Sequence, residues 1–168
     1  MDLHFNLVLN KDKGESTYYF EKIFCFDKAG RKLRSLTHSW GENNPRLAYL
    51  RHDGTKQFIT EDYKLENDTF GDSGGPLQIW DLTRHHEMVD VTRQFPKEAL
   101  KHAKAAMARY LDDKKQGIAS EHYLLSYYGD LCLAGEKKKA ETELRRGKEG
   151  MQELCDKISA QLKKHGYL

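Results

Sequence analysis

The chain has 168 residues, of which 38% are hydrophobic and 32% charged, and its formal net charge is +2 at neutral pH. This length suits one compact fold that buries its own core, and the weak net charge argues against a dedicated, strongly basic nucleic-acid binder. No apolar run reaches the roughly 18–20 residues of a membrane-spanning helix, and the first residues lack a signal-peptide pattern. An odd number of cysteines without CxxC spacing favours a reducing compartment. We therefore expect a soluble, cytoplasmic protein.

The first half of the chain has the pattern of β-strands. Apolar residues alternate with polar ones in the first run, and aromatic residues occupy both faces of the second, which predicts a central strand there. An Asp53-Gly54 step between two later runs is typical of a hairpin turn. The economical arrangement is an antiparallel sheet of about five to six strands. The runs are residues 3–9, 17–26, 32–40, 47–51, 55–65, 77–80 and 88–92.

The second half has the pattern of three helices. Pro96 suits a first helical turn, and apolar residues follow at helical spacing to position 111. A second helix is predicted over 120–132 and a third over 136–164, where Gly147 and Gly150 suggest a bend or a close helix crossing. The apolar stripe of the third helix has four- and three-residue steps, so it suits packing within the chain or a homodimer through this helix.

These patterns predict an α+β protein. Residues 1–95 form the sheet subdomain and residues 96–168 the helical subdomain, with one core shared between them.

Residues 70–77 read Phe-Gly-Asp-Ser-Gly-Gly-Pro-Leu. This string resembles the segment around the nucleophile of chymotrypsin-like serine proteases. The resemblance implies that Ser73 is a nucleophile, with a histidine as its base and a carboxylate to orient that histidine. His38 and Asp53, or Asp62 in place of Asp53, precede Ser73 in the order of that family.

The remainder of the chain departs from the protease pattern. Two six-stranded barrels cannot be built when only about five strand-like runs precede Ser73 and about 70 helix-patterned residues follow it. His38 also lacks the small-residue context of the family's histidine. The alternative interpretation is a glycine-rich turn that enters the strand at Leu77, with Asp72 and Ser73 as turn residues.

A second candidate site is the cluster of His85 and His86 with Glu87 and Asp90, whose side chains are of the types that bind zinc. Adjacent histidines on a strand point to opposite faces, which favours a polar loop over a metal site. We expect no cofactor.

The third candidate site is a cluster of lysine and arginine residues on the predicted helices. Lysines on the first predicted helix, Lys97, Lys101 and Lys104, add to it, and such side chains suit phosphate contacts. Acidic residues are interleaved, so a solvated helix face is the alternative. The binding candidates are Lys137, Lys138, Lys139, Arg145, Arg146 and Lys148.

No complete catalytic constellation can be assembled from these residues. We therefore predict a small intracellular binding protein, of immunity, anti-defence or regulatory type, that recognises or neutralises a macromolecular partner, with a protein favoured as that partner. The alternatives are a serine hydrolase that uses Ser73 and a nucleic-acid-binding protein that uses the basic C-terminal helices.

Overall fold

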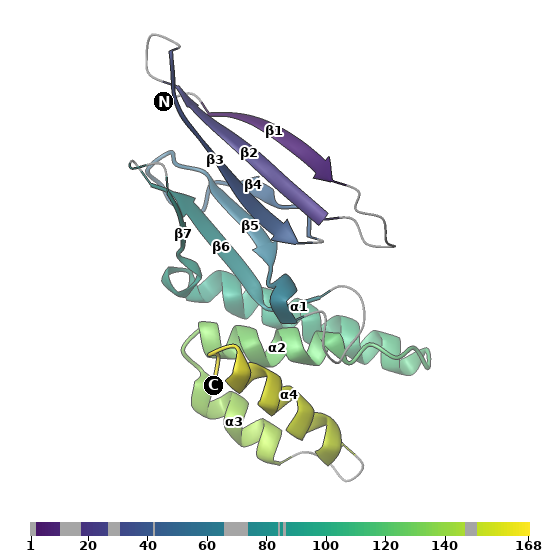
Figure 1. The fold of residues 1–168 in the computed structure, drawn as a ribbon. Coiled ribbons are helices and arrows are strands. Elements are labelled where there is room, and N and C mark those ends of the chain that lie inside the picture. The colour runs from purple at the N-terminus through teal and green to yellow at the C-terminus, as the bar shows by residue number, and fades with distance from the viewer. Residues whose placement is uncertain are drawn as a thin grey trace. The chain divides into compact units, whose positions relative to one another are not determined.

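The computed structural model describes residues 3–10, 18–26, 31–41, 43–65, 74–83, 85, 87–146 and 151–168. Within these residues, seven strands precede four α-helices, so the predicted α+β class is confirmed (Figure 1). The chain divides into two compact units. Unit 1 comprises Met1–Thr60 with Ile79–Val91, and unit 2 comprises Glu61–Gln78 with Thr92–Leu168.

The strands are distributed over two sheets. Strands β1 (Leu3–Asn10), β2 (Tyr18–Phe26) and β3 (Lys32–Gly41) form an antiparallel meander in that order. The middle position of β2 agrees with the central strand predicted for this run. Gly41 has a φ of 64° and is the last residue of β3.

The second sheet has the order β4-β5-β6-β7. Its strands are β4 (Arg46–Ala48), β5 (Gln57–Glu61), β6 (Leu77–Leu82) and β7 (Met88–Asp90). Strand β4 pairs antiparallel with β5, and β6 pairs antiparallel with β7. The chain between β4 and β5 contains the predicted turn, in which Gly54 has a φ of 79°.

The core of unit 1 is an aromatic cluster that includes residues of both sheets. Ile23, Trp40 and Phe58 are buried. The Trp40 ring stacks on Phe58 at 5.4 Å between ring centroids, and Trp80 meets Trp40 edge-on at 6.4 Å. Burial of such large rings is a major source of stability.

Unit 2 is built around four helices. They are α1 (Pro96–Lys115), α2 (His122–Leu133), α3 (Lys137–Arg145) and α4 (Gln152–Lys164). Helix α1 packs on α2, which also contacts α3 and α4. The buried face of α1 is mostly alanine, and small side chains allow two helices to approach closely.

The third predicted helix is two helices. Helices α3 and α4 lie side by side as separate helices (Figure 1). Ala140, Leu144, Ile158 and Leu162 of the predicted apolar stripe are buried within the chain. The homodimer through this stripe stays a prediction.

Residues 74–77, here called the GGPL segment, are buried and belong to unit 2 rather than to the strand-rich unit. A β-carbon added to Gly129 of α2 would lie 2.2 Å from Cγ of Pro76. The absence of a side chain at Gly129 therefore allows Pro76 to lie directly on the helix.

We expect Gly129→Ala to lower the free energy of unfolding, measured by urea denaturation, by about 1–3 kcal/mol. The rigid Pro76 ring must move, and this cost exceeds the gain of about 1 kcal/mol that alanine normally gives over glycine inside a helix. The control is Ser159→Ala on α4, with an expected change within about 0.5 kcal/mol. A more stable Gly129→Ala variant would contradict the close packing of Pro76 on α2.

Candidate functional site

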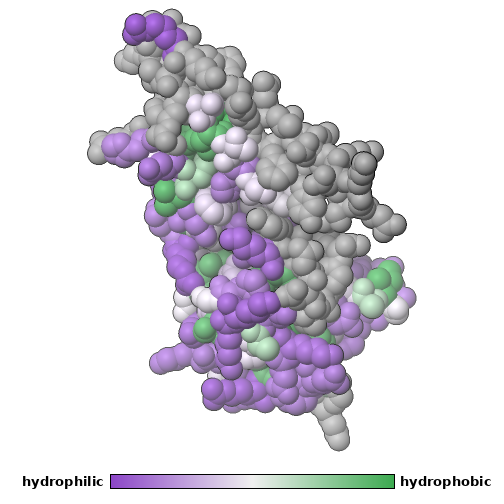
Figure 2. All heavy atoms as spheres, viewed as in Figure 1, coloured by the Kyte–Doolittle hydropathy of each residue, from purple (hydrophilic) through white to green (hydrophobic). Residues whose placement is uncertain are grey.

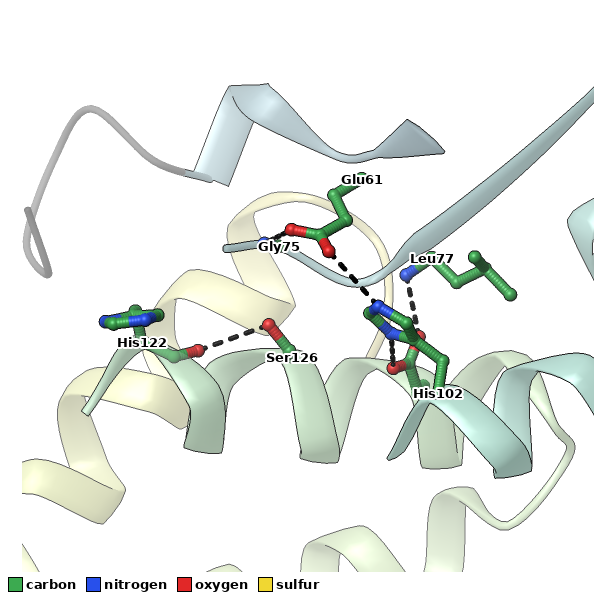
Figure 3. Close-up of polar contacts among 7 residues, drawn as sticks. Glu61, Gly75, Leu77, His102, His122 and Ser126 are labelled. Atoms are coloured by element: carbon green, nitrogen blue, oxygen red, sulfur yellow. Dashed lines mark hydrogen bonds and ion pairs between the residues drawn. The ribbon is translucent and has the colours of Figure 1, made fainter. Parts of the chain in front are cut away.

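Three ionisable side chains of unit 2 meet beside the GGPL segment (Figure 3). His102 of α1 lies between Asp130 of α2 and Glu61, the last residue of β5. Its Nδ1 is 2.6 Å from Oδ2 of Asp130, and its Nε2 is 3.2 Å from Oε1 of Glu61. We call Glu61, His102 and Asp130 the carboxylate clamp.

Each carboxylate of the clamp also holds the backbone of the GGPL segment. The Leu77 N–H donates to Oδ1 of Asp130 at 2.7 Å, and the Gly75 N–H donates to Oε2 of Glu61 at 3.4 Å (Figure 3). The clamp therefore connects one histidine ring to two peptide N–H groups through two carboxylates.

Asp62 makes a further connection next to the clamp. Its N–H donates to the Pro76 carbonyl at 2.8 Å, and its Oδ2 accepts the Tyr167 hydroxyl at 2.8 Å. A β-carbon on Gly75 would lie 2.4 Å from the Asp62 carbonyl oxygen, so only glycine fits there without displacing the backbone. The C-terminal end of the chain is thus attached to the same segment.

Burial and hydrogen bonding shift the pKa values of the clamp residues in opposite directions. Burial lowers the pKa of His102, but its hydrogen bonds to Asp130 and Glu61 outweigh burial and raise this pKa to about 9. Burial raises the pKa of Glu61, but the hydrogen bond and charge of His102 bring it below its ordinary value. The pKa of Asp130, whose side chain is 0% exposed, is raised by burial against the hydrogen bonds from His102 and Leu77.

At neutral pH His102 is therefore an imidazolium ion that donates both of its N–H groups to carboxylates. Such a ring has no free lone pair with which to accept a proton, attack a carbonyl or bind a metal. A pKa near 9 also places it well above the range suited to a general base at neutral pH. The clamp is thus suited to holding the fold together rather than to acid–base catalysis.

His122, the first residue of α2, lies beside Gly74, the first residue of the GGPL segment. A β-carbon on Gly74 would lie 2.7 Å from its Cδ2, and its ring packs on Tyr123 at 4.0 Å between centroids. Burial lowers the pKa of His122 despite the nearby acidic residues. The buried Ser126 hydroxyl donates to the His122 carbonyl at 3.3 Å, as is common for serine inside a helix, so this pair is not a nucleophile and its base.

The structure describes only some residues of the predicted serine-protease-like site. Ser73 is outside the described residues, while His38 is in unit 1, where its ring lies 4.3 Å from Trp40 and 4.6 Å from Trp80 between centroids. The exposed Asp53 carboxylate accepts the Thr55 N–H at 2.9 Å within the turn after β4, and hydrogen bonds from Thr55 lower its pKa. The Ser73–His38–Asp53 site stays a prediction.

Of the two adjacent histidines in the predicted metal site, the structure describes one. His85 is exposed in the turn between β6 and β7, where its N–H donates to the Thr83 hydroxyl at 3.3 Å, and His86 lies outside the described residues. Among the side chains that the structure describes, no group of three or more His, Cys, Asp or Glu is arranged to hold a metal ion.

The described members of the predicted basic set are exposed: Lys137, Lys138, Lys139, Arg145 and Arg146. Lys148 lies outside the described residues. The three lysines border a shallow hollow with Gly135 and Glu136. Lys139 pairs with Glu136 at 3.0 Å. Helical spacing places Lys138, Arg145 and Arg146 on one side, opposite the buried Ala140 and Leu144. We call Lys138, Arg145 and Arg146 the α3 basic face.

Figure 2 shows hydrophilic side chains over most of the visible surface of the helical unit. Among the described residues, none of the helices combines the length and the apolar character needed to cross a membrane. No protein-family model, curated protein or solved structure matches the chain.

The carboxylate clamp was not predicted from the sequence. Its one sequence signal is Asp130, an acidic residue within the otherwise apolar helical run from Leu124 to Leu133. Because a buried charge needs a partner, this position alone indicated that a basic group must lie close by.

We expect His102→Ala to lower the free energy of unfolding by about 3–5 kcal/mol in urea denaturation at pH 7, because Asp130 is left buried without its cation. The control is His52→Ala, which removes an exposed histidine from a turn and should change stability by less than about 0.5 kcal/mol. Equal stability of the two variants would show that the clamp does not form.

A comparison of wild type with His102→Ala reveals the pH dependence of the clamp. The pKa of His102 is about 9 in the folded chain, above its ordinary value of about 6.5, so its contribution is complete below pH 6.5 and is lost as the pH rises through 9. Wild type should therefore lose more stability between pH 7 and 10 than His102→Ala does. Comparison of the two removes the contribution of other groups that titrate in this range.

Proposed function

We propose that this chain is a binding protein that recognises a protein partner with an acidic surface, and that the α3 basic face makes the contact. The observation that carries this proposal is the position of three exposed cations opposite the buried residues of α3: Lys138 and Arg145 of the helix and Arg146, its C-terminal cap. At about 1.5 Å per residue they extend over about 12 Å of helix. An immunity, anti-defence or regulatory role is part of this proposal.

The environments of the ionisable groups favour a binding role over catalysis. Both ring nitrogens of His102 are occupied by carboxylates. The buried Cys132 and Cys155 both have a pKa raised by burial, which disfavours the reactive thiolate. These groups are poorly suited to reaction chemistry, whereas the exposed cations are available for contact.

A protein is favoured as the partner by the composition of this surface. Two of the three cations are arginines, whose planar guanidinium groups match carboxylates and are enriched in protein interfaces. Glu141 and Glu143 are partly exposed on the same helix, and the Glu143 carboxylate accepts the Tyr127 hydroxyl at 3.1 Å. A surface of mixed charge suits a partner with a matching pattern, while a uniform polyanion would be repelled by these glutamates.

We expect the variant Lys138→Gln/Arg145→Gln/Arg146→Gln to fail to retain the partner that wild type captures from nuclease-treated lysate of the source organism. With that partner purified, the association rate should fall by about tenfold or more, because charges at the edge of an interface mainly steer the encounter. The matched control is Lys97→Gln/Lys101→Gln/Lys104→Gln on α1, which removes the same charge and should bind normally. Unchanged binding by the α3 variant would refute the proposal.

A further inference from the structure

The solvent side of α1 carries lysines in its first turns and again at its C-terminal end. Lys97, Lys101, Lys104 and Lys115 are exposed, and helical spacing places them within a narrow arc opposite the buried Ala99, Ala103, Ala106 and Tyr110. At about 1.5 Å per residue the row extends over about 27 Å. We call these four lysines the α1 lysine row.

The surroundings of the row leave its ammonium groups accessible. Ala105 and Ala108 are exposed beside Lys101 and Lys104, while Leu111, which is 49% exposed, lies on the same side between Lys104 and Lys115. Glu98 reaches Lys101 only at 4.0 Å, and the Lys101 side chain is 82% exposed. The Asp112 carboxylate, which lies within the row between Lys104 and Lys115, accepts a hydrogen bond from the Gln116 side chain at 3.2 Å.

We propose that the α1 lysine row binds the phosphate backbone of nucleic acid. This inference goes beyond the proposed function, because it assigns a second surface and a different partner. A lysine ammonium is a compact point charge that suits phosphate oxygens, and a row of them follows the repeated charge of a nucleic-acid strand.

The composition of the row also favours nucleic acid over a protein partner. The row contains none of the aromatic or arginine anchors that are typical of protein interfaces. It also contains none of the Arg, Asn or Gln side chains that read base edges, so the expected binding is independent of sequence. Four phosphate contacts predict that log K falls with log salt concentration with a slope of about −3 to −4.

The experiment measures fluorescence anisotropy of a labelled duplex of about 20 base pairs, and of one of its strands, with the full chain at 50–200 mM NaCl. We expect affinity to fall about 100-fold over this range. In Lys97→Gln/Lys101→Gln/Lys104→Gln the slope should become shallower by about 3, since three phosphate contacts are lost. The matched control, Lys138→Gln/Arg145→Gln/Arg146→Gln on α3, should keep the wild-type slope, and urea denaturation should confirm that both variants fold.

Binding of either nucleic acid with this dependence on α1 supports the proposal, and the stronger of the two identifies the preferred form. No binding at 50 mM NaCl, or an equal loss in both triple variants, would overturn it. Binding to phosphatidylserine vesicles without binding to nucleic acid would also overturn it. Because the protein partner is captured after nuclease treatment and through α3, failure of this inference leaves the proposed function standing, and the reverse holds as well.

Discussion

Unit 2 depends on the requirement that a fully buried carboxylate must be paired. The Asp130 side chain is 0% exposed, and its two oxygens take a hydrogen bond from the His102 ring and one from the Leu77 N–H. These two bonds fix α1 and the GGPL segment relative to α2, and Glu61 completes the arrangement at the other ring nitrogen. Removing one partner of such a group leaves a charge in a medium of low dielectric constant, where it is strongly unfavourable. The contact of Pro76 with Gly129 brings the segment close enough for these bonds to form.

Because buried carboxylates must be paired, the charged groups inside unit 2 differ from those on its surface. Carboxylates of Glu61, Asp62 and Asp130 are used within the fold, where they hold a ring, a tyrosine hydroxyl and backbone N–H groups. The exposed sides of α1 and α3 carry lysine and arginine instead. A chain with a net charge of only +2 thus presents two locally basic helix faces, which differ in composition. This difference is the basis for assigning a protein to one face and nucleic acid to the other.

Local patterns predicted the elements well, because alternation and helical spacing are properties of neighbouring residues. Two-residue periodicity located β1, β2 and β3, and Pro96 located the start of α1. Local patterns could not resolve α3 from α4, since a stripe with four- and three-residue steps fits one long helix and two packed ones equally well. The carboxylate clamp joins residues that are 41 and 28 positions apart, so its geometry depends on tertiary packing. Only Asp130, a charge within an apolar helix, signalled that such a site exists.

The measurement that tests the clamp most directly is a ¹H–¹⁵N NMR titration of the His102 ring between pH 5 and 11, with His102→Gln used to assign its signals. We predict that both ring nitrogens are protonated at pH 7 and that the midpoint lies at about 9. A midpoint near the ordinary value of about 6.5, with a neutral tautomer at pH 7, would contradict this account. The ring would then have a free lone pair, and acid–base chemistry beside the GGPL segment would replace a structural role for His102.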